Sequence, residues 1–186
     1  MAKKGFDRDT VLDNAITLFW QHGYTASSVH LITQFTGLKP GSLYNEFGSK
    51  EGLFKAALER YSYKSTLELH LAFKHQPDVK SAITEILHNM ISEANKVNYC
   101  GCFIIKTQLE LAAQENQLYQ LACEKLVETE RIYQHYLMQS FTENTSIKYA
   151  QQLMMTIFGL RIYGYQKANS DSLTISVTAL LPWLGH

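Results

Sequence analysis

The sequence has few of the residues that mark disulfide-stapled, fibrous or linker-rich proteins. Its 186 residues include three cysteines, three prolines and ten glycines. An odd and small number of cysteines in a chain of this length makes no disulfide framework, and it favours a reducing, cytosolic compartment. The low proline and glycine content excludes collagen-like and linker-dominated chains.

No charge of one sign predominates. Lys and Arg together number 17, as do Asp and Glu, so the formal net charge is zero. A strongly basic chain is the simplest sign of a nucleic-acid binder, and this sign is missing. A small DNA-binding module on a larger neutral body stays possible.

Long hydrophobic runs are also missing. The richest apolar stretch, residues 153–165, is interrupted by Thr156, Gly159, Arg161 and Gly164. It falls short of the ~18 consecutive apolar residues that a membrane helix needs. No continuous apolar stretch follows the N-terminal lysines, as a signal peptide would require. We therefore expect a soluble cytoplasmic protein with no membrane partner and, at 46% hydrophobic residues, a real core.

The apolar residues recur with the period of an α-helix. Leu12, Ala15, Ile16 and Phe19 follow the i, i+3, i+4, i+7 spacing of one helical face. Similar spacing continues to the end of the chain, and no segment alternates as a strand would. The sequence predicts an all-α fold of about nine helices, around residues 12–22, 28–36, 40–47, 50–73, 82–91, 102–112, 118–141, 150–160 and 173–184, with a turn at 142–146.

Three short helices with tight glycine turns in the first fifty residues suit a helix-turn-helix. In such a motif the second helix, here residues 40–47, enters the DNA major groove, and the first, residues 28–36, lies across the backbone. Tyr44 and Asn45 have polar groups that can bind a phosphate or a base edge. Lys50 opens the next helix, where its charge and the helix N-terminus would both face an anion.

The run of residues 37–54 resembles the signature of the TetR/AcrR family of bacterial transcriptional regulators. The shared elements are the glycine at 37, the Gly-Ser-Leu-Tyr run at 41–44, Phe47, and the Ser-Lys-Glu run at 49–51, preceded by His-Gly-Tyr at 22–24. The resemblance implies a helix-turn-helix DNA-binding domain at residues 1–60, with its motif at about 28–47. It implies a helical effector-binding and dimerisation domain at 61–186. The expected function is sequence-specific transcriptional regulation, as a repressor that an unknown small-molecule effector releases from a double-stranded DNA operator.

The resemblance also implies which residues contact DNA. Family positions that grip phosphates match Tyr44 and Lys50, and a hydroxyl that caps the second helix and faces a phosphate matches Ser28. Positions near bases and backbone match Lys39, Pro40, Gly41, Ser42 and Asn45.

The sequence departs from the family pattern in three places. Lys39 stands where a capping hydroxyl is common, and Leu31 where a carboxylate would complete a capping box. Glu46 puts a negative charge beside the expected DNA face. Residues 1–50 hold five Lys or Arg against four Asp or Glu, a net charge of only +1. We therefore expect operator affinity to depend on few ion contacts.

Cys102 is the sharpest feature of the C-terminal part. It is expected at the N-terminus of a helix, with Lys106 one turn later, and a helix N-terminus and a cation both favour the reactive thiolate. The Gly-Cys pair followed by Glu110 is similar to a TetR subgroup that includes regulators responding to electrophiles or oxidants. Two alternatives stay open. Cys102 can be a small buried hydrophobe or a plain ligand contact, and Lys106 can pair with Glu110 instead.

An effector pocket is expected between the fourth and eighth helices, where the candidate lining residues are Phe103, Tyr133, Phe158, Arg161 and Tyr163. Ordinary core packing is the alternative for each aromatic residue. Arg161 lies in an apolar helix and needs a partner, either a carboxylate such as Glu110 or an anionic ligand.

The last two helices are the expected homodimer interface. One stripe consists of Leu173, Val177, Leu180, Leu181 and Leu184, and the other of Ala150, Leu153, Ile157, Leu160 and Gly164. Two such helices from each subunit would form a four-helix bundle. The alternative is that both stripes belong to the core of one subunit.

Two other classes of protein compete with a DNA-binding regulator. A cytosolic thiol enzyme could use Cys102 as its nucleophile, but no arrangement of cysteine with a histidine base supports it. A helical protein-interaction module could keep the helix-turn-helix without using it. The sequence has no glycine-rich phosphate loop, no H-E-x-x-H and no C-x-x-C. We therefore expect no enzyme activity, no cofactor and no metal.

Overall fold

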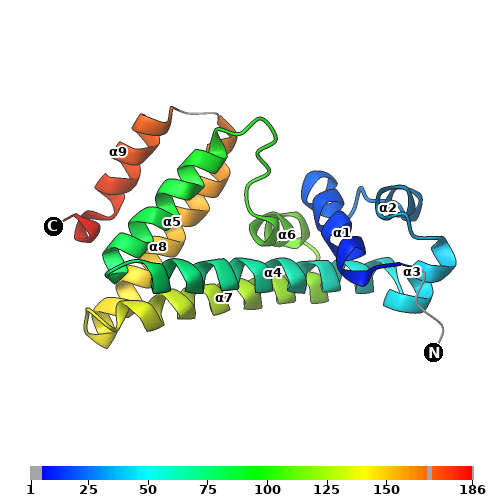
Figure 1. Ribbon diagram of the computed structural model, residues 1–186, viewed down its shortest axis with the longest axis horizontal. Coiled ribbons are helices and arrows are strands. Elements are labelled where there is room, and N and C mark those ends of the chain that lie inside the picture. Colours follow the sequence, from blue (N-terminus) through cyan, green and yellow to red (C-terminus); the bar gives the residue numbers. More distant parts are fainter. Residues whose placement is uncertain (1–5, 167–168, 186) are drawn as a thin grey trace. The chain divides into compact units, whose positions relative to one another are not determined.

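The computed structural model describes residues 6–166 and 169–185, so the N-terminal lysines lie outside the described residues. Within these ranges the chain is all-α and has no strand, as the sequence predicted (Figure 1). The helices are α1 Arg8–His22, α2 Val29–Thr36, α3 Pro40–Phe47, α4 Lys50–His75, α5 Val79–Ala94, α6 Phe103–Leu111, α7 Gln117–Leu137, α8 Glu143–Tyr163 and α9 Ser170–Leu180, with short 3-10 turns η1 Gly164–Gln166 and η2 Pro182–Leu184. None of these helices is long and apolar enough to span a membrane.

The chain forms two compact units. Unit 1 consists of residues 1–64 and 102–125, and unit 2 of residues 65–101 and 126–186. Unit 1 therefore adds α6 and the first part of α7 to the N-terminal helices. The long helices α4 and α7 each contribute residues to both units.

Unit 1 is organised around the apolar face of α1. Asp7 caps this helix by accepting a hydrogen bond from the amide of Thr10, and the predicted Gly23 ends it. Phe19 on this face meets Phe54 of α4 edge-on, with ring centroids 4.7 Å apart. Phe103 continues the cluster from α6, with its centroid 5.3 Å from that of Phe54. These aromatic contacts hold α1, α4 and α6 in one core.

An ion-pair cluster joins α1 to α4. The guanidinium of Arg60 donates from Nε and Nη2 to the two carboxylate oxygens of Asp13, at 2.8 and 3.0 Å. Lys64 adds a third bond to the same carboxylate at 2.7 Å. The hydrogen bonds from Arg60 hold the pKa of Asp13 at about 2, below its ordinary value of 3.8.

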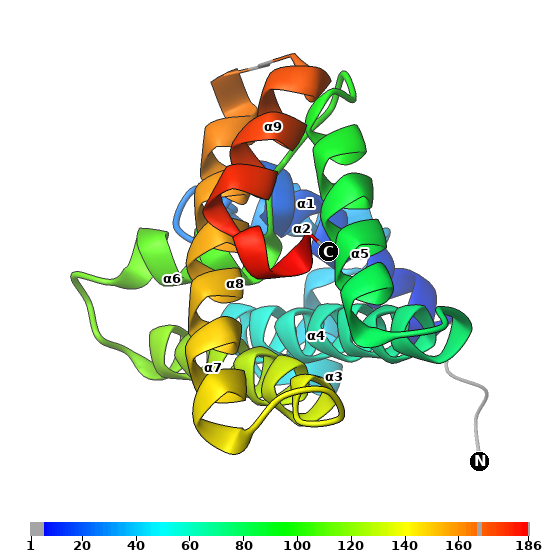
Figure 2. The ribbon, with the colours of Figure 1, turned by 90° about the vertical axis from the view of Figure 1, so that its left-hand side faces the viewer.

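Unit 2 contains the packed helices α5, α8 and α9 (Figures 1 and 2). Asp78 caps α5 and Thr142 caps α8, each with its side chain accepting a backbone N–H. Arg161 of α8 donates to Glu93 of α5 at 2.6 Å, and the hydroxyl of Tyr99 donates to the carbonyl of Arg161 at 2.9 Å. The last turns of α5 and α8 are therefore joined through polar contacts.

Three predicted boundaries were wrong. The polar segment 142–146 is not a turn, because Thr142 is the N-cap of α8 and residues 143–146 form its first helical turn. The first turn of a helix is often polar, so composition alone did not separate it from a loop. The helix α7 ends at Leu137 rather than near Phe141, and α9 ends at Leu180, which places Leu184 in η2.

Candidate nucleic-acid interface

The helices α2 and α3 form the helix-turn-helix that the sequence predicted. Ser28 caps α2 by accepting from the amide of Leu31 at 3.1 Å. Gly37 ends α2 in the left-handed region, at φ 72°, where glycine carries no steric penalty. Pro40 is the first residue of α3, as expected for a residue without an N–H. Ile32 and Leu43 are fully buried and fix the two helices to the core of unit 1.

Most of the predicted DNA-contacting side chains lie at the surface. Tyr44 is 49% exposed although its ring is apolar, so its hydroxyl is available to a partner. The others that are exposed are Ser28, Lys39, Pro40, Gly41 and Asn45, and Ser42 and Lys50 are half-buried. Lys39 precedes α3 without a side-chain capping bond. The exposed surface of α3 and of the residue before it therefore includes the polar groups of Lys39, Tyr44 and Asn45.

Gly41 has no side chain, so the backbone at the start of α3 is accessible. A Cβ atom added at Gly41 would have no atom within 4 Å, and the residue lies in an ordinary helix. Packing within the chain therefore gives no reason for a glycine here. A backbone that approaches an external partner closely does give one.

Lys50 is held in place from inside unit 1. Its Nζ lies 4.3 Å from the ring centroid of Tyr24, a cation–π contact. Partial burial lowers the pKa of Lys50, and the negative charge of Glu110 acts in the opposite direction. The ammonium group at the start of α4 is thus oriented before any ligand arrives.

The negative charge that the sequence puts beside the expected DNA face, that of Glu46, has a cationic partner. Its side chain is only 14% exposed, and its Oε1 lies 3.2 Å from Nε of Arg8 at the start of α1. The guanidinium of Arg8 also lies over the ring of Phe47, 5.5 Å from its centroid. The role of Arg8 was not predicted, because no local sequence pattern connects residues 38 positions apart.

Four of the sensor and pocket candidates belong to unit 1. Cys102 is the N-cap of α6, as predicted, and its sulfur accepts a weak hydrogen bond from the hydroxyl of Tyr61 at 3.8 Å. Phe103 is buried in the aromatic core. The predicted alternative of a Lys106–Glu110 pair was wrong. Lys106 donates to the carbonyl of Trp20, and Glu110 accepts from the turn after α1.

The other four candidates belong to unit 2. Tyr133 is buried against Phe73, and Phe158 is half-buried on α8. Arg161 has the carboxylate partner that its position demanded, but this partner is Glu93 and not Glu110. Tyr163 is 59% exposed and lies on the surface of α8.

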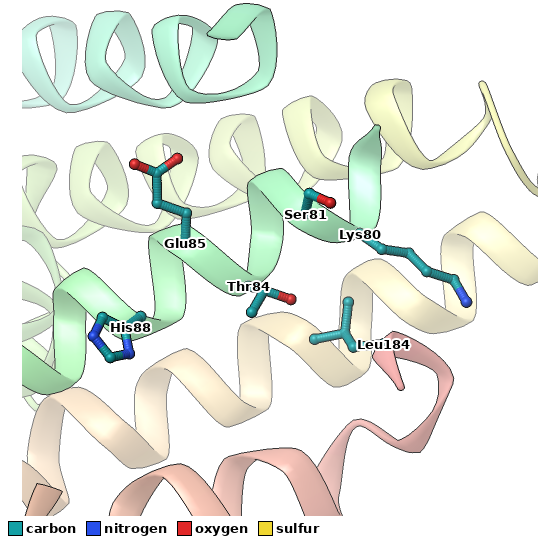
Figure 3. A pocket seen from close by; sticks show the side chains of 6 residues that line it. All are labelled: Lys80, Ser81, Thr84, Glu85, His88 and Leu184. Carbon is teal, nitrogen blue, oxygen red and sulfur yellow. The ribbon is translucent and has the colours of Figure 1, made fainter. Parts of the chain in front are cut away.

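Unit 2 also carries a hollow of about 420 Å³ along α5. Figure 3 shows its lining side chains, which are Lys80, Ser81, Thr84, Glu85, His88 and, from η2, Leu184. None of the eight sensor and pocket candidates lines it. Among the residues that the structure describes, no cluster of three or more histidine, cysteine or acidic side chains could hold a metal ion.

The apolar stripe predicted for dimerisation on α8 is part of the core of unit 2, so this prediction was wrong. Its five residues, Ala150, Leu153, Ile157, Leu160 and Gly164, are all buried within the single chain. The exposed side of α8 nevertheless carries large apolar side chains, with Met155 at 68% and Ile162 at 48%. On α9, Leu173 and Val177 are buried, whereas Ile175 and Leu180 are 70% and 62% exposed.

Comparison with known proteins agrees with the helix-turn-helix and with the whole fold. Residues 11–57 match the family model described as bacterial regulatory proteins, tetR family. The fold of a cysteine mutant of the TetR-family regulator CifR, solved with 26-bp operator DNA, has a TM-score of 0.82 at 24% identity over 97% of this chain and 98% of that one. A TetR regulator from Chloroflexus aurantiacus J-10-FL has a TM-score of 0.80 at 21% identity over 95% of this chain and 93% of that one.

Two curated relatives come from Escherichia coli strain K12. The HTH-type transcriptional repressor ComR is 36% identical over 139 residues, which are 73% of this chain and 66% of ComR. The HTH-type transcriptional repressor BdcR is 30% identical over 102 residues, which are 54% of this chain and 52% of BdcR. The chain thus spans just under two thirds of ComR and about half of BdcR. It belongs to the TetR family of bacterial regulatory proteins.

Proposed function

We propose that this protein is a cytoplasmic repressor that binds a double-stranded DNA operator as a homodimer and leaves it when a small-molecule effector binds. The observation that carries the proposal is the exposed surface of α3, where Tyr44 and Asn45 lie in the middle of the helix and one turn after Gly41, whose Cβ position is open space. The relatives ComR and BdcR are transcriptional repressors, which supports the direction of regulation.

The DNA-binding domain of this proposal is the segment 1–60. Tyr44 and Lys50 bind phosphates, and Ser28 faces a third phosphate from the N-terminus of α2. Asn45 reads a base edge, and Lys39, Pro40, Gly41 and Ser42 form the leading edge of α3 in the major groove. With Glu46 paired to Arg8, the one acidic side chain of α3 does not repel the DNA.

The dimerisation surface of the proposal lies on α8 and α9, within the segment 61–186. It combines the exposed face of α8, around Met155, Gly159 and Ile162, with that of α9, around Ile175 and Leu180. Large apolar side chains on two adjacent helices favour association with a second copy. A two-fold dimer also supplies the two reading heads that a palindromic operator requires.

Release by an effector requires that the effector bind the DNA-free state more tightly than the DNA-bound state. The helix α4 begins at the proposed phosphate contact, Lys50, and continues into unit 2. A shift of this single helix could therefore link effector binding to DNA binding. The proposed effector-responsive residues fall into two groups. The group in unit 1 is Cys102, Phe103, Lys106 and Glu110. The group in unit 2 is Tyr133, Phe158, Arg161 and Tyr163.

The experiment that tests the proposal is a gel shift with the promoter fragment next to the protein's own gene. We expect a discrete complex at nanomolar protein that resists excess unrelated DNA, since specific binding exceeds nonspecific binding by a factor of about 10³ or more. Equal affinity for the promoter and for unrelated DNA would exclude a sequence-specific regulator and favour an interaction module with an unused helix-turn-helix.

A further inference from the structure

Two charged side chains of α6, one helical turn apart, reach the end of α1. Lys106 donates from Nζ to the carbonyl of Trp20 in the last turn of α1. Glu110 accepts from the backbone amides that follow: its Oε2 lies 3.0 Å from the amide nitrogen of Tyr24, and its Oε1 lies 2.8 Å from that of Thr25. Both oxygens of one carboxylate therefore bind consecutive amides of the turn between α1 and α2.

The charges match the groups that they contact. The last carbonyls of a helix have no partner within it and carry the negative end of the helix dipole, so a cation suits them. Backbone amides in a turn need acceptors, and a carboxylate is a strong one. Lys106 and Glu110 thus satisfy the polar groups on either side of the helix end.

Gly23 confirms how closely Glu110 approaches. A Cβ atom at position 23 would lie 2.6 Å from Oε2 of Glu110, and the backbone there has φ +79°. Glycine is favoured at this position by its backbone conformation, and a Cβ there would displace the carboxylate of Glu110 from its present place.

The turn that Glu110 holds leads to both parts of the proposed DNA surface. The ring of Tyr24 lies under the ammonium group of Lys50, with Nζ 4.3 Å from the ring centroid. In the other direction the hydroxyl of Ser27 donates to the carbonyl of Gly23 at 2.6 Å, and the next residue caps α2. A displacement of this turn would move the start of α2 and the support of Lys50 together.

We propose that Glu110 is a positioning residue for DNA binding: its carboxylate fixes the turn between α1 and α2, and through it the helix-turn-helix and Lys50. This inference rests on the proposed function, since it assumes that unit 1 binds an operator. It assigns to α6 a role that the motif of residues 28–47 does not contain.

The direction in which one substitution changes DNA affinity separates a positioning role of Glu110 from a purely electrostatic one. Glu110→Gln removes a negative charge near Lys50, and charge alone would then strengthen DNA binding. Loss of positioning predicts the opposite, a weakening of about tenfold, which corresponds to ~1.4 kcal/mol. Glu110→Asp keeps the charge but is one methylene too short to reach both amides, so it should weaken binding as well. The control is Glu59→Gln, which removes an exposed charge of the same unit and should change affinity less than twofold.

Amide hydrogen exchange of the DNA-free protein tests the contact without reference to DNA. In Glu110→Gln the amides of Tyr24 and Thr25 should exchange at least about tenfold faster, because they lose a charge-assisted acceptor. The amide of Ala15, in the core part of α1, should be unchanged, which excludes general unfolding.

The inference is overturned if the two amides exchange as in the wild type, or if they are released and Glu110→Gln still binds the promoter fragment as tightly as the wild type. Failure of the wild-type protein to recognise that fragment would instead count against the proposed function. The exchange result would then still decide whether Glu110 holds the turn.

Discussion

Arg8 at the first turn of α1 lies 3.2 Å from Glu46 near the end of α3, measured from Nε to Oε1. The pair gives the one acidic side chain of α3 a cationic partner within unit 1. The negative charge of Glu46, which is unfavourable near DNA, is therefore balanced by Arg8, which lies 38 residues earlier in the chain.

Arg8→Ala should weaken operator binding about fivefold, because an exposed ion pair contributes up to ~1 kcal/mol and Glu46 would then repel phosphates. Fluorescence anisotropy with a labelled promoter fragment measures the effect. Glu46→Gln in the same background should restore affinity. If the double variant binds as weakly as Arg8→Ala, Arg8 acts on DNA directly and not by neutralising Glu46.

Lys50→Ala should lower affinity and reduce the slope of log K against log salt by about one, as expected for the loss of one phosphate contact. Titrations at several salt concentrations give this slope. Lys55→Ala removes an exposed cation of the same helix and serves as the matched control. Equal slopes for both variants would mean that Lys50 makes no phosphate contact.

The ion pair between Asp13 and Arg60 predicts an acid-dependent stability. The pKa of Asp13 is about 2 in the folded protein and 3.8 without its partners, so its stabilising effect is complete above pH 4. It is lost as the pH falls from about 4 to 2. Since Asp13 is partly exposed, solvent screening limits the effect to about 1 kcal/mol. Urea unfolding at pH 7 and at pH 2.5 should show a smaller loss for Asp13→Asn than for the wild type, and an identical loss would contradict the pKa assignment.

Charge on the exposed face of α9 should break the dimer. Ile175→Lys and Leu180→Glu each bury a charge in the proposed apolar interface, which is costly without a partner. Analytical ultracentrifugation at micromolar concentration should then find monomers, whereas Thr174→Glu, at another exposed position of α9, should stay dimeric. A wild-type monomer, or dimers in all three variants, would place the interface elsewhere.

Cys102 should react with a mild alkylating agent faster than Cys123, because it lies at the N-cap position of α6 whereas Cys123 lies within α7. Peptide mass spectrometry identifies the modified site. If the thiol is the sensor, alkylation should also lower operator affinity, and Cys102→Ser should abolish this response while binding DNA normally. An inert Cys102 would leave it as a packing residue and point to a conventional pocket ligand.

Local signals allowed most of the fold and the helix-turn-helix to be predicted. A hydroxyl cap at Ser28, a left-handed stop at Gly37 and a proline at position 40 each determine their own few residues of backbone. Apolar spacing predicted that α8 exists but not which of its apolar residues face outward, because Met155 and Ile162 lie on the exposed side and periodicity does not say which side meets the core.

The long-range contacts could not be predicted in the same way. Glu110 binds amides 85 and 86 residues earlier in the chain, and Arg161 binds a carboxylate 68 residues away. Both residues stood out by sequence, one through the Gly-Cys subgroup pattern and the other as a charge in an apolar helix. Their partners depend on how the helices pack, which no short motif records.

The most direct test of the account is an anisotropy titration of the promoter fragment and a scrambled fragment of the same composition, with the wild type and with the double variant Tyr44→Ala, Asn45→Ala. The account predicts that the wild type prefers the promoter at least about 10³-fold and that the double variant loses most of this preference while keeping weak, salt-sensitive binding to both fragments. A wild type without preference, or a double variant that discriminates as well as the wild type, would contradict the claim that the exposed side chains of α3 read the operator.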